Sequence, residues 1–437
     1  MIQAALDEWI LNEAIPFSLD PPETLNGAID RLIASLDPSV ELLGFGEALH
    51  GGEEILLLRN RLFQRLVDKH GYSAIAMESS FPRSRAVNER VSGSGSAESY
   101  DAVREVGFSH GFGSLEANRE LVEWMRAYNA DPAHKAKLHF YGFDSPTEMT
   151  FSDSPSGVLH FILDYLESID GQRVRARRER IDSYLGEDLG WENPAAMMDP
   201  SQSVGLSHEA TALRIETEEL ITELLVRRPE LVARGGVSRY QEAVHYAKVA
   251  RQLLNYHAVL AQDSPDRILL ALGLRDAMMA ENLEYIVSHE RGRGKVLAFA
   301  HNSHLKRGRA EWQLGSDLLQ WWPAGAHLAE IFGPRYAAIG TAVGFSEENG
   351  IGEPEAGTME ARLAAAVGPG LFIPTHRGLG LSASEVGALL IRSGSGKNPT
   401  YFPLTPQSLS DFDALAFLDT VRYSRGGAGA AVGNSSE

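Results

Sequence analysis

Four stretches of this chain combine the pattern of a buried strand with side chains suited to acid/base chemistry where the strand ends. They are residues 39–45 followed by Gly46-Glu47-Ala48-Leu49-His50, residues 73–77 followed by Glu78, residues 138–143 followed by Asp144, and residues 295–300 followed by His301-Asn302-Ser303-His304. An open parallel sheet binds its ligand beyond the carboxyl ends of its strands. A packed core needs no carboxylate or imidazole there, so the sequence predicts an active site at this edge.

The spacing within two of these clusters favours general-base chemistry. Glu47 and His50 are three residues apart at the predicted start of a helix, and His301 and His304 share that spacing. Residues three apart on a helix lie on one face. A carboxylate beside an imidazole fixes its tautomer and raises its basicity. A single such pair is also typical of a helix cap or a surface contact, but two pairs at strand ends, together with Glu78, favour catalysis.

Two further charged residues each have two interpretations. Arg59 lies nine residues after His50 on the following predicted helix. It is either a salt-bridged structural side chain or a cation that stabilises an oxyanion. Asp144 either orients a catalytic group or caps the next helix, and we favour a structural role for it.

The nucleophile predicted from the residue types is water. The chain contains no cysteine, which excludes disulfides, thiolate ligands and a cysteine nucleophile. It also lacks the Gly-x-Ser-x-Gly elbow of serine hydrolases. The carboxylates and imidazoles could bind zinc, manganese or iron, but there is no His-Glu-x-x-His pair. We therefore predict a site that uses neither a metal nor another cofactor.

The elements that position these residues alternate between strand and helix, which predicts an α/β fold with a parallel-rich central sheet flanked by helices. Residues 155–290 depart from this alternation and show only helical periods. We predict helices there at residues 157–186, 206–228, 238–262 and 267–289. This large α-helical insertion has the size of a small domain, and we expect it to act as a lid and a substrate wall.

The predicted organisation divides the chain into four parts. They are the first part of the α/β core (1–154), the helical insertion (155–290), the second part of the core (291–423) and a disordered tail (424–437). A helix is also predicted over residues 3–36, with a break at its prolines. After the insertion, the pattern predicts a helix at residues 311–321 and strands at 326–331, 336–341 and 414–418.

Composition limits the partners. The 437 residues include 40 basic and 59 acidic side chains, for a net charge of −19. Such a surface repels nucleic-acid phosphates and anionic lipid heads. No apolar run approaches the roughly 18 residues of a membrane span, and the first residues lack the basic region of a signal peptide. We expect a cytoplasmic protein whose partner is a small molecule; the oligomeric state is open.

In combination, these motifs resemble the erythromycin esterase family. The matching pieces are Gly46-Glu47-Ala48-Leu49-His50-Gly51, Arg59, Ala76-Met77-Glu78, Glu123-Trp124-Met125-Arg126-Ala127-Tyr128-Asn129, Tyr141-Gly142-Phe143-Asp144, Arg275-Asp276 with Met279 and Asn282, and Ala300-His301-Asn302-Ser303-His304. They occur in family order between about residues 5 and 420. The departures, at Ala48-Leu49 and Gly52, affect the first loop and leave the substrate open.

The resemblance implies an α/β core with a large helical insertion and metal-free hydrolysis of a macrolide lactone. His50 matches the family's general base, and Glu78 matches an essential acidic residue. Glu47, Arg59, His301 and His304 match further active-site residues. The family includes antibiotic-resistance esterases and relatives that belong to natural-product biosynthesis.

The leading hypothesis is a hydrolase that opens an ester or lactone of a bulky, apolar small molecule. His50 would activate water, Glu47 and Glu78 would stabilise its imidazolium, and Arg59 with His301 or His304 would stabilise the oxyanion or protonate the leaving alkoxide. One alternative is a lyase, cyclase or isomerase that uses the same acid/base groups without water. Another is a non-catalytic protein that binds small molecules on this scaffold.

Overall fold

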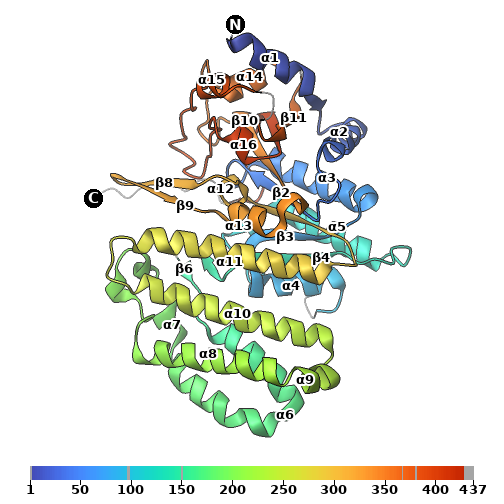
Figure 1. Ribbon diagram of the computed structural model, residues 1–437. Coiled ribbons are helices and arrows are strands. Elements are labelled where there is room, and N and C mark those ends of the chain that lie inside the picture. Colours follow the sequence, from blue (N-terminus) through green and yellow to red (C-terminus); the bar gives the residue numbers. More distant parts are fainter. Residues whose placement is uncertain (1, 96–98, 149–150, 367, 379–380, 428–437) are drawn as a thin grey trace. The chain divides into compact units, whose positions relative to one another are not determined.

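A computed structural model describes residues 2–95, 99–148, 151–366, 368–378 and 381–427 (Figure 1). The chain forms two compact units. The first comprises residues 1–78, 83–143 and 286–437, and the second comprises residues 79–82 and 144–285. Every predicted site residue except Asp144 belongs to the first unit.

The first unit is built on an eight-stranded sheet in the order β1-β11-β12-β10-β2-β7-β3-β4. The pairings β12-β10, β10-β2, β2-β7 and β7-β3 are parallel, whereas β1 and β11 join antiparallel at one edge. The predicted parallel-rich α/β fold is therefore confirmed. The strands are β1 (Ile15–Phe17), β2 (Leu42–Glu47), β3 (Tyr72–Ser80), β4 (His139–Asp144), β7 (Lys295–His301), β10 (Tyr336–Phe345), β11 (Gly370–Pro374) and β12 (Ala414–Thr420).

The two faces of this sheet carry residues of different size. On one face, large side chains such as Phe45, Met77 and Phe299 form a buried core with α2 (Pro22–Ser35), α3 (Glu53–His70) and α5 (Glu116–Ala130). The alternate positions point to the opposite face, and there β2, β3 and β7 carry mainly glycine and alanine. These small residues are Gly44, Gly46, Ala74, Ala76, Ala298 and Ala300. This second face therefore leaves room for a close helix.

That helix is the short α12 (Asn302–Leu305), which follows β7 directly. A Cβ atom on Gly46 would lie 2.2 Å from Oδ1 of Asn302. The Asn302 carboxamide donates to the Thr341 carbonyl at 2.8 Å and accepts from the Thr341 backbone N–H at 3.1 Å. Only glycine at position 46 permits this approach, which fixes α12 against β2 and β10.

The remaining helices of the first unit complete its coverage. They are α1 (Ile2–Glu13), α4 (Phe81–Ser92, whose first two residues belong to the second unit), α13 (Ala324–Phe332), α14 (Met359–Ala364), α15 (Ala383–Gly387) and α16 (Ser408–Asp411). Among the described helices, none combines the length and the apolar character that a membrane crossing requires.

Two predictions after residue 300 are wrong. The predicted helix at 311–321 is a β-hairpin of β8 (Ala310–Leu314) and β9 (Asp317–Trp321), whose turn contains Gly315 at a φ of 60°. A two-residue Gly-Ser turn with positive φ suits a hairpin. The predicted strand at 326–331 is helix α13, where Ala324, Leu328 and Phe332 are buried at a spacing of four residues. That spacing is helical, and an apolar run this short is ambiguous until it is packed.

The two ends of the chain also differ from expectation. Residues 15–17, predicted to lie in a broken helical segment, form the edge strand β1. Proline is tolerated on an edge strand because one side needs no N–H donor. The predicted disordered tail is ordered at least over residues 424–427, since Arg425 pairs with Glu53 at 2.5 Å. Residues 428–437 lie outside the described part of the chain.

The second unit is helical apart from the two-residue strands β5 (Thr147–Glu148) and β6 (Phe151–Ser152). The helical segments predicted between residues 157 and 289 correspond to four of its helices. Its helices are α6 (Ser156–Leu185), α7 (Asp188–Trp191), α8 (His208–Val226), α9 (Arg228–Gly235), α10 (Val237–Leu260) and α11 (Arg267–Glu290), the last of which ends in the first unit. The expected closure of this unit over the active site stays a prediction.

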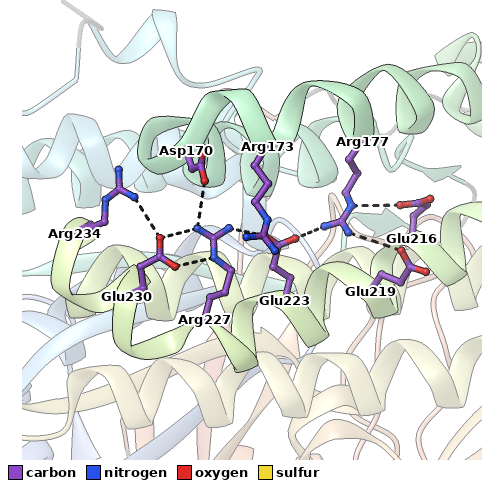
Figure 2. Close-up of polar contacts among 9 residues, drawn as sticks. All are labelled: Asp170, Arg173, Arg177, Glu216, Glu219, Glu223, Arg227, Glu230 and Arg234. Atoms are coloured by element: carbon purple, nitrogen blue, oxygen red, sulfur yellow. Dashed lines mark hydrogen bonds and ion pairs between the residues drawn. The ribbon is translucent and has the colours of Figure 1, made fainter.

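An ion-pair network joins α6 to the helices that follow it (Figure 2). Arg177 of α6 pairs with three carboxylates of α8, namely Glu216, Glu219 and Glu223. Arg227 continues the row, because it pairs with Glu223 at 2.6 Å and with Glu230 at 2.9 Å. Isolated surface pairs add little stability, but a network that is partly shielded from water adds more. The network holds the helices of this unit in register.

The close contact at Gly46 generates a stability prediction. Gly46→Ala should lower the free energy of unfolding by about 1–3 kcal/mol, because the added methyl group displaces the Asn302 carboxamide from Thr341. Gly27→Ala in α2 is the matched control, because no atom lies within 4 Å of its added Cβ. Alanine there should be neutral or stabilising. Chemical denaturation of both variants tests this, and equal stability of Gly46→Ala and the wild type would contradict it.

Candidate active site

The site begins at the turn between β2 and α3. Glu47 is the last residue of β2, and α3 starts only at Glu53, so the predicted position of Glu47 and His50 on one helix face is wrong. His50 instead lies in a turn that continues through Gly51, whose φ is 79°. The two side chains still meet, with 2.6 Å between His50 Nδ1 and Glu47 Oε1.

This contact sets the protonation chemistry of His50. Burial disfavours the imidazolium, but the charge and hydrogen bond of Glu47, with the charge of Glu78, outweigh burial and raise the pKa of His50. The Nδ1–H group donates to the carboxylate, which leaves the lone pair of the neutral ring on Nε2. Nε2 is therefore the atom that can take a proton from water.

Glu78 links three elements beside this pair. It lies inside β3, two residues before the strand ends, and is only 3% exposed. Its Oε2 accepts a hydrogen bond of 2.8 Å from the backbone N–H of His301, and its Oε1 lies 3.3 Å from His304 Nε2. Glu78 thus connects β3 with the end of β7 and with α12, as the strand-edge argument predicts.

His301 has both ring nitrogens engaged within the protein. Nε2–H donates to the Thr400 carbonyl at 2.7 Å, and Nδ1 lies 2.7 Å from the Ser303 hydroxyl and caps α12. Burial, with repulsion from His50, lowers the pKa of His301 to about 3. Its ring centroid lies 5.2 Å from that of His50. We assign His301 a positioning role, because a neutral ring with both nitrogens bonded is poorly placed to transfer a proton.

Arg59 does not reach the surface of the site. It is fully buried, donates to Asn60 Oδ1 at 2.7 Å, and places its guanidinium over the Phe299 ring at 4.7 Å. Burial lowers its pKa to about 10, although the charge of Glu47 opposes the shift. Arg59 remains a cation at neutral pH, and its complete burial keeps it from contact with a substrate oxygen.

Asp144 belongs to the second unit and is engaged in an ion pair. It is fully buried and accepts hydrogen bonds from Arg275 Nε at 3.0 Å and from Arg275 Nη2 at 2.6 Å. A buried carboxylate and guanidinium bonded at two nitrogens stabilise each other strongly. This contact accords with the structural role that we favoured for Asp144.

Sequence reasoning missed the segment that positions both imidazoles. The Thr400 hydroxyl accepts from the backbone N–H of His50 at 2.9 Å, while the Thr400 carbonyl accepts from His301. Asn398 supports this arrangement, since it accepts from the Thr400 hydroxyl at 2.6 Å and donates to the His50 carbonyl at 3.3 Å. No local pattern in the irregular last third of the sequence marks these two residues.

Two aromatic residues near His50 were also missed. The ring centroids of Phe112 and His110 lie 5.1 and 6.4 Å from that of His50. They belong to the segment Ser109-His110-Gly111-Phe112-Gly113 between α4 and α5. His110 lies in a loop between two helices, where no local pattern marks it, and its distance in sequence from Glu47 conceals the contact.

The hydrogen bonds argue for acid/base chemistry over the alternative metal site of Glu47, His50, Glu78, His301 and His304. His50 Nδ1 and both nitrogens of His301 already have protein partners, whereas a metal needs ligand lone pairs that converge on one point. The arrangement instead resembles a carboxylate-oriented general base at a sheet edge.

The contact between Glu47 and His50 generates a prediction about pH. Glu47→Gln removes the negative charge that raises the pKa of His50, so this pKa should fall. A general base acts when neutral, and the acid limb of kcat/KM should therefore move to lower pH, while the plateau falls at least about tenfold because the base is weaker. NMR titration of the His50 ring and a pH–rate profile measure both effects.

Glu89→Gln is the matched control, because Glu89 is an exposed carboxylate paired with Arg85. It should leave the His50 titration unchanged. A Glu47→Gln variant whose His50 titrates as in the wild type would show that Glu47 does not set the basicity of this ring.

Comparisons with known proteins agree with the fold. The model of the erythromycin esterase family matches residues 67–421. Erythromycin esterase type II of Escherichia coli is 22% identical over 340 residues, which cover 76% of each chain. Erythromycin esterase type I of Escherichia coli is 21% identical over 325 residues, which cover 71% of this chain and 72% of the relative.

Solved structures share the fold. A Bacillus cereus protein superposes with a TM-score of 0.75 at 19% identity, over 97% of this chain and 99% of the other. A mutant of the erythromycin esterase EreC in its open conformation gives a TM-score of 0.66 at 16% identity, over 94% and 98%. The family match spans most of the sequence and supports a hydrolase-type function. The chain belongs to the erythromycin esterase family.

Proposed function

We propose that this protein hydrolyses an ester or lactone of a bulky, apolar small molecule, with water activated by His50 and without a metal. The observation that carries the proposal is the 2.6 Å contact between His50 Nδ1 and Glu47 at the carboxyl end of β2. It creates a base with a defined tautomer at the edge where such sheets bind ligands. The names of the curated relatives support an ester as the substrate class.

The reaction follows from the atoms available. His50 Nε2 takes a proton from water as the water oxygen attacks the ester carbonyl carbon, and Glu47 stabilises the resulting imidazolium. The carbonyl oxygen becomes an oxyanion in the tetrahedral intermediate, and the positive charge of buried Arg59 lowers the electrostatic cost of that charge. The C–O bond then breaks and the leaving alkoxide takes a proton. Glu78 holds His301 and His304 in place throughout.

A macrolide lactone is the substrate suggested by the family resemblance and by the relatives' names. At 22% identity the substrate itself is a proposal, because residues that line a pocket diverge faster than a catalytic pair. The net charge of −19 disfavours polyanionic partners such as nucleic acid.

The experiment that tests the proposal incubates the protein with a panel of macrolactones and simple esters, followed by mass spectrometry. We expect a product heavier than its substrate by one water molecule, or the separated acid and alcohol of a simple ester. An isobaric product would instead support isomerase or cyclase chemistry. A fragment formed by elimination would support a lyase, and an unchanged but bound ligand would support a binding protein.

The same experiment includes the His50→Ala variant, which lacks the proposed general base. Loss of a positioned general base typically lowers the rate by about 10²–10⁴. His50 lies in a turn and is partly exposed, so the fold should survive, as circular dichroism can verify. A His50→Ala variant that keeps kcat within about threefold of the wild type would exclude His50 as the base.

The proposed mechanism uses no metal ion. Activity should survive exhaustive treatment with chelators, because His50 Nδ1 and both His301 nitrogens are committed to protein hydrogen bonds. Elemental analysis of the purified protein accompanies the assay. One zinc or manganese per chain, with activity lost on its removal and restored on its return, would overturn the metal-free mechanism.

A further inference from the structure

Ester hydrolysis needs two proton transfers, one from the attacking water and one to the leaving alkoxide. His50 is suited to the first. Of the other imidazoles predicted from the sequence, His301 has both nitrogens bonded to protein groups, and His304 is 8% exposed with Nε2 against Glu78. His301 therefore has no ring nitrogen left for proton transfer, and His304 is nearly buried.

His110 is a further imidazole at the same site. Its ring is nearly parallel to that of His50, with 19° between the planes and 6.4 Å between the centroids. Phe112 packs against both rings, at 5.2 Å from His110 and 5.1 Å from His50. A ring nitrogen of His110 also lies within 4.8 Å of a Glu78 carboxylate oxygen. His110 is partly exposed, as is His50.

This separation suits two groups that act on one carbonyl carbon. The attacking and leaving oxygens are bonded to the same tetrahedral carbon, and each needs an acid or base nitrogen at about 2.6–3.2 Å. Two rings several ångströms apart can flank such a centre, whereas two rings in contact could not. The 6.4 Å between the His50 and His110 centroids is of the size that such a centre and its two hydrogen bonds span.

The backbone holds His110 in an uncommon conformation. Its φ is 57°, and the following Gly111 has a φ of 68°. A left-handed conformation costs a residue with a Cβ roughly 1–2 kcal/mol, and such residues persist where surrounding contacts enforce them, often at functional sites. Of the described non-glycine residues with positive φ, His376 and Arg377 lie in another loop, and His110 lies at the site.

Contacts on both sides fix this segment. Tyr100 donates to the Gly113 carbonyl at 2.9 Å, and Asn118 donates to the Phe112 carbonyl at 2.8 Å. Gly113 packs so tightly that an added Cβ would lie 1.7 Å from the Arg104 carbonyl oxygen. The ring of His110 is therefore presented from a rigid wall of the site.

We propose that His110 is a second acid/base residue of this site and that, as an imidazolium, it protonates the leaving alkoxide. The inference rests on the proposed ester hydrolysis. As the C–O bond breaks, its electron pair goes to the leaving oxygen, which takes the proton from the His110 ring, while His50 keeps the proton taken from water. The products are the acid and the alcohol. His50 then gives its proton to solvent and His110 regains one, so the cycle consumes only the ester and water.

The test compares two esters of one acid, p-nitrophenyl butyrate and ethyl butyrate. p-Nitrophenolate leaves without a proton, whereas ethoxide requires one. His110→Asn is the informative variant, because asparagine tolerates a left-handed backbone and removes the acid. We expect kcat/KM for ethyl butyrate to fall by about 10²–10⁴, and that for p-nitrophenyl butyrate to fall by less than about tenfold.

His208→Asn is the matched control, because the side chain of His208 is 85% exposed on the second unit. It should leave both rates unchanged. An equal loss on both esters, or no loss on either, would overturn the assignment of His110 and leave the proposed function standing. A wild-type protein that cleaves neither these esters nor any ester of the panel would overturn the proposed function, and this inference with it.

Discussion

The arrangement of the site depends on the burial of one carboxylate, Glu78. A carboxylate removed from water is costly unless hydrogen bonds replace its hydration. Here the backbone N–H of His301 and the ring of His304 contribute to that replacement, so β3, the end of β7 and α12 must meet at one point. A second buried carboxylate, Glu290, contacts His139, Tyr141 and Ser73 near the starts of β3 and β4. A buried carboxylate beside an imidazole thus occurs at both ends of these strands, and at the carboxyl ends Glu78 lies close to the Glu47–His50 pair.

The close approach of α12 depends in turn on the absence of side chains on one face of the sheet. Gly44 and Gly46 leave space for Leu305 and Asn302, the two ends of α12. The Gly-x-Gly pattern in this strand is therefore explained by packing, because both glycines leave space for α12. Because Gly46 directly precedes Glu47, the residue that admits α12 and the residue that orients His50 are neighbours in sequence. The short motif at the end of β2 carries both packing and chemistry.

The sequence predicted β2, β3, β4, β7, β10 and β12, and the residues that end four of them, because both signals are local; the edge strands β1 and β11 were not predicted. A buried parallel strand is a continuous apolar run, and a charged residue that ends such a run is conspicuous. The hairpin at residues 310–321 and helix α13 were mispredicted because short amphipathic runs fit either period. Thr400 and His110 were missed for a different reason. Thr400 acts on His50 from 350 residues away in the chain, and no single-sequence pattern encodes a contact at that separation.

The imidazoles of His50 and His301 have different pKa values because their surroundings differ, although their ring centroids lie only 5.2 Å apart. Both are partly buried, which disfavours the charged form of each. His50 faces the Glu47 carboxylate, which outweighs burial and raises the pKa of His50. Burial, together with repulsion from His50, lowers the pKa of His301 to about 3, and its hydrogen bond to the neutral Thr400 carbonyl offsets only part of that shift. The surroundings therefore favour the protonated form of His50 and the neutral form of His301. Acid/base sites typically place chemically similar groups in environments that separate their pKa values. Here the two groups are both histidines, and they differ because His50 faces a carboxylate whereas His301 faces a neutral carbonyl.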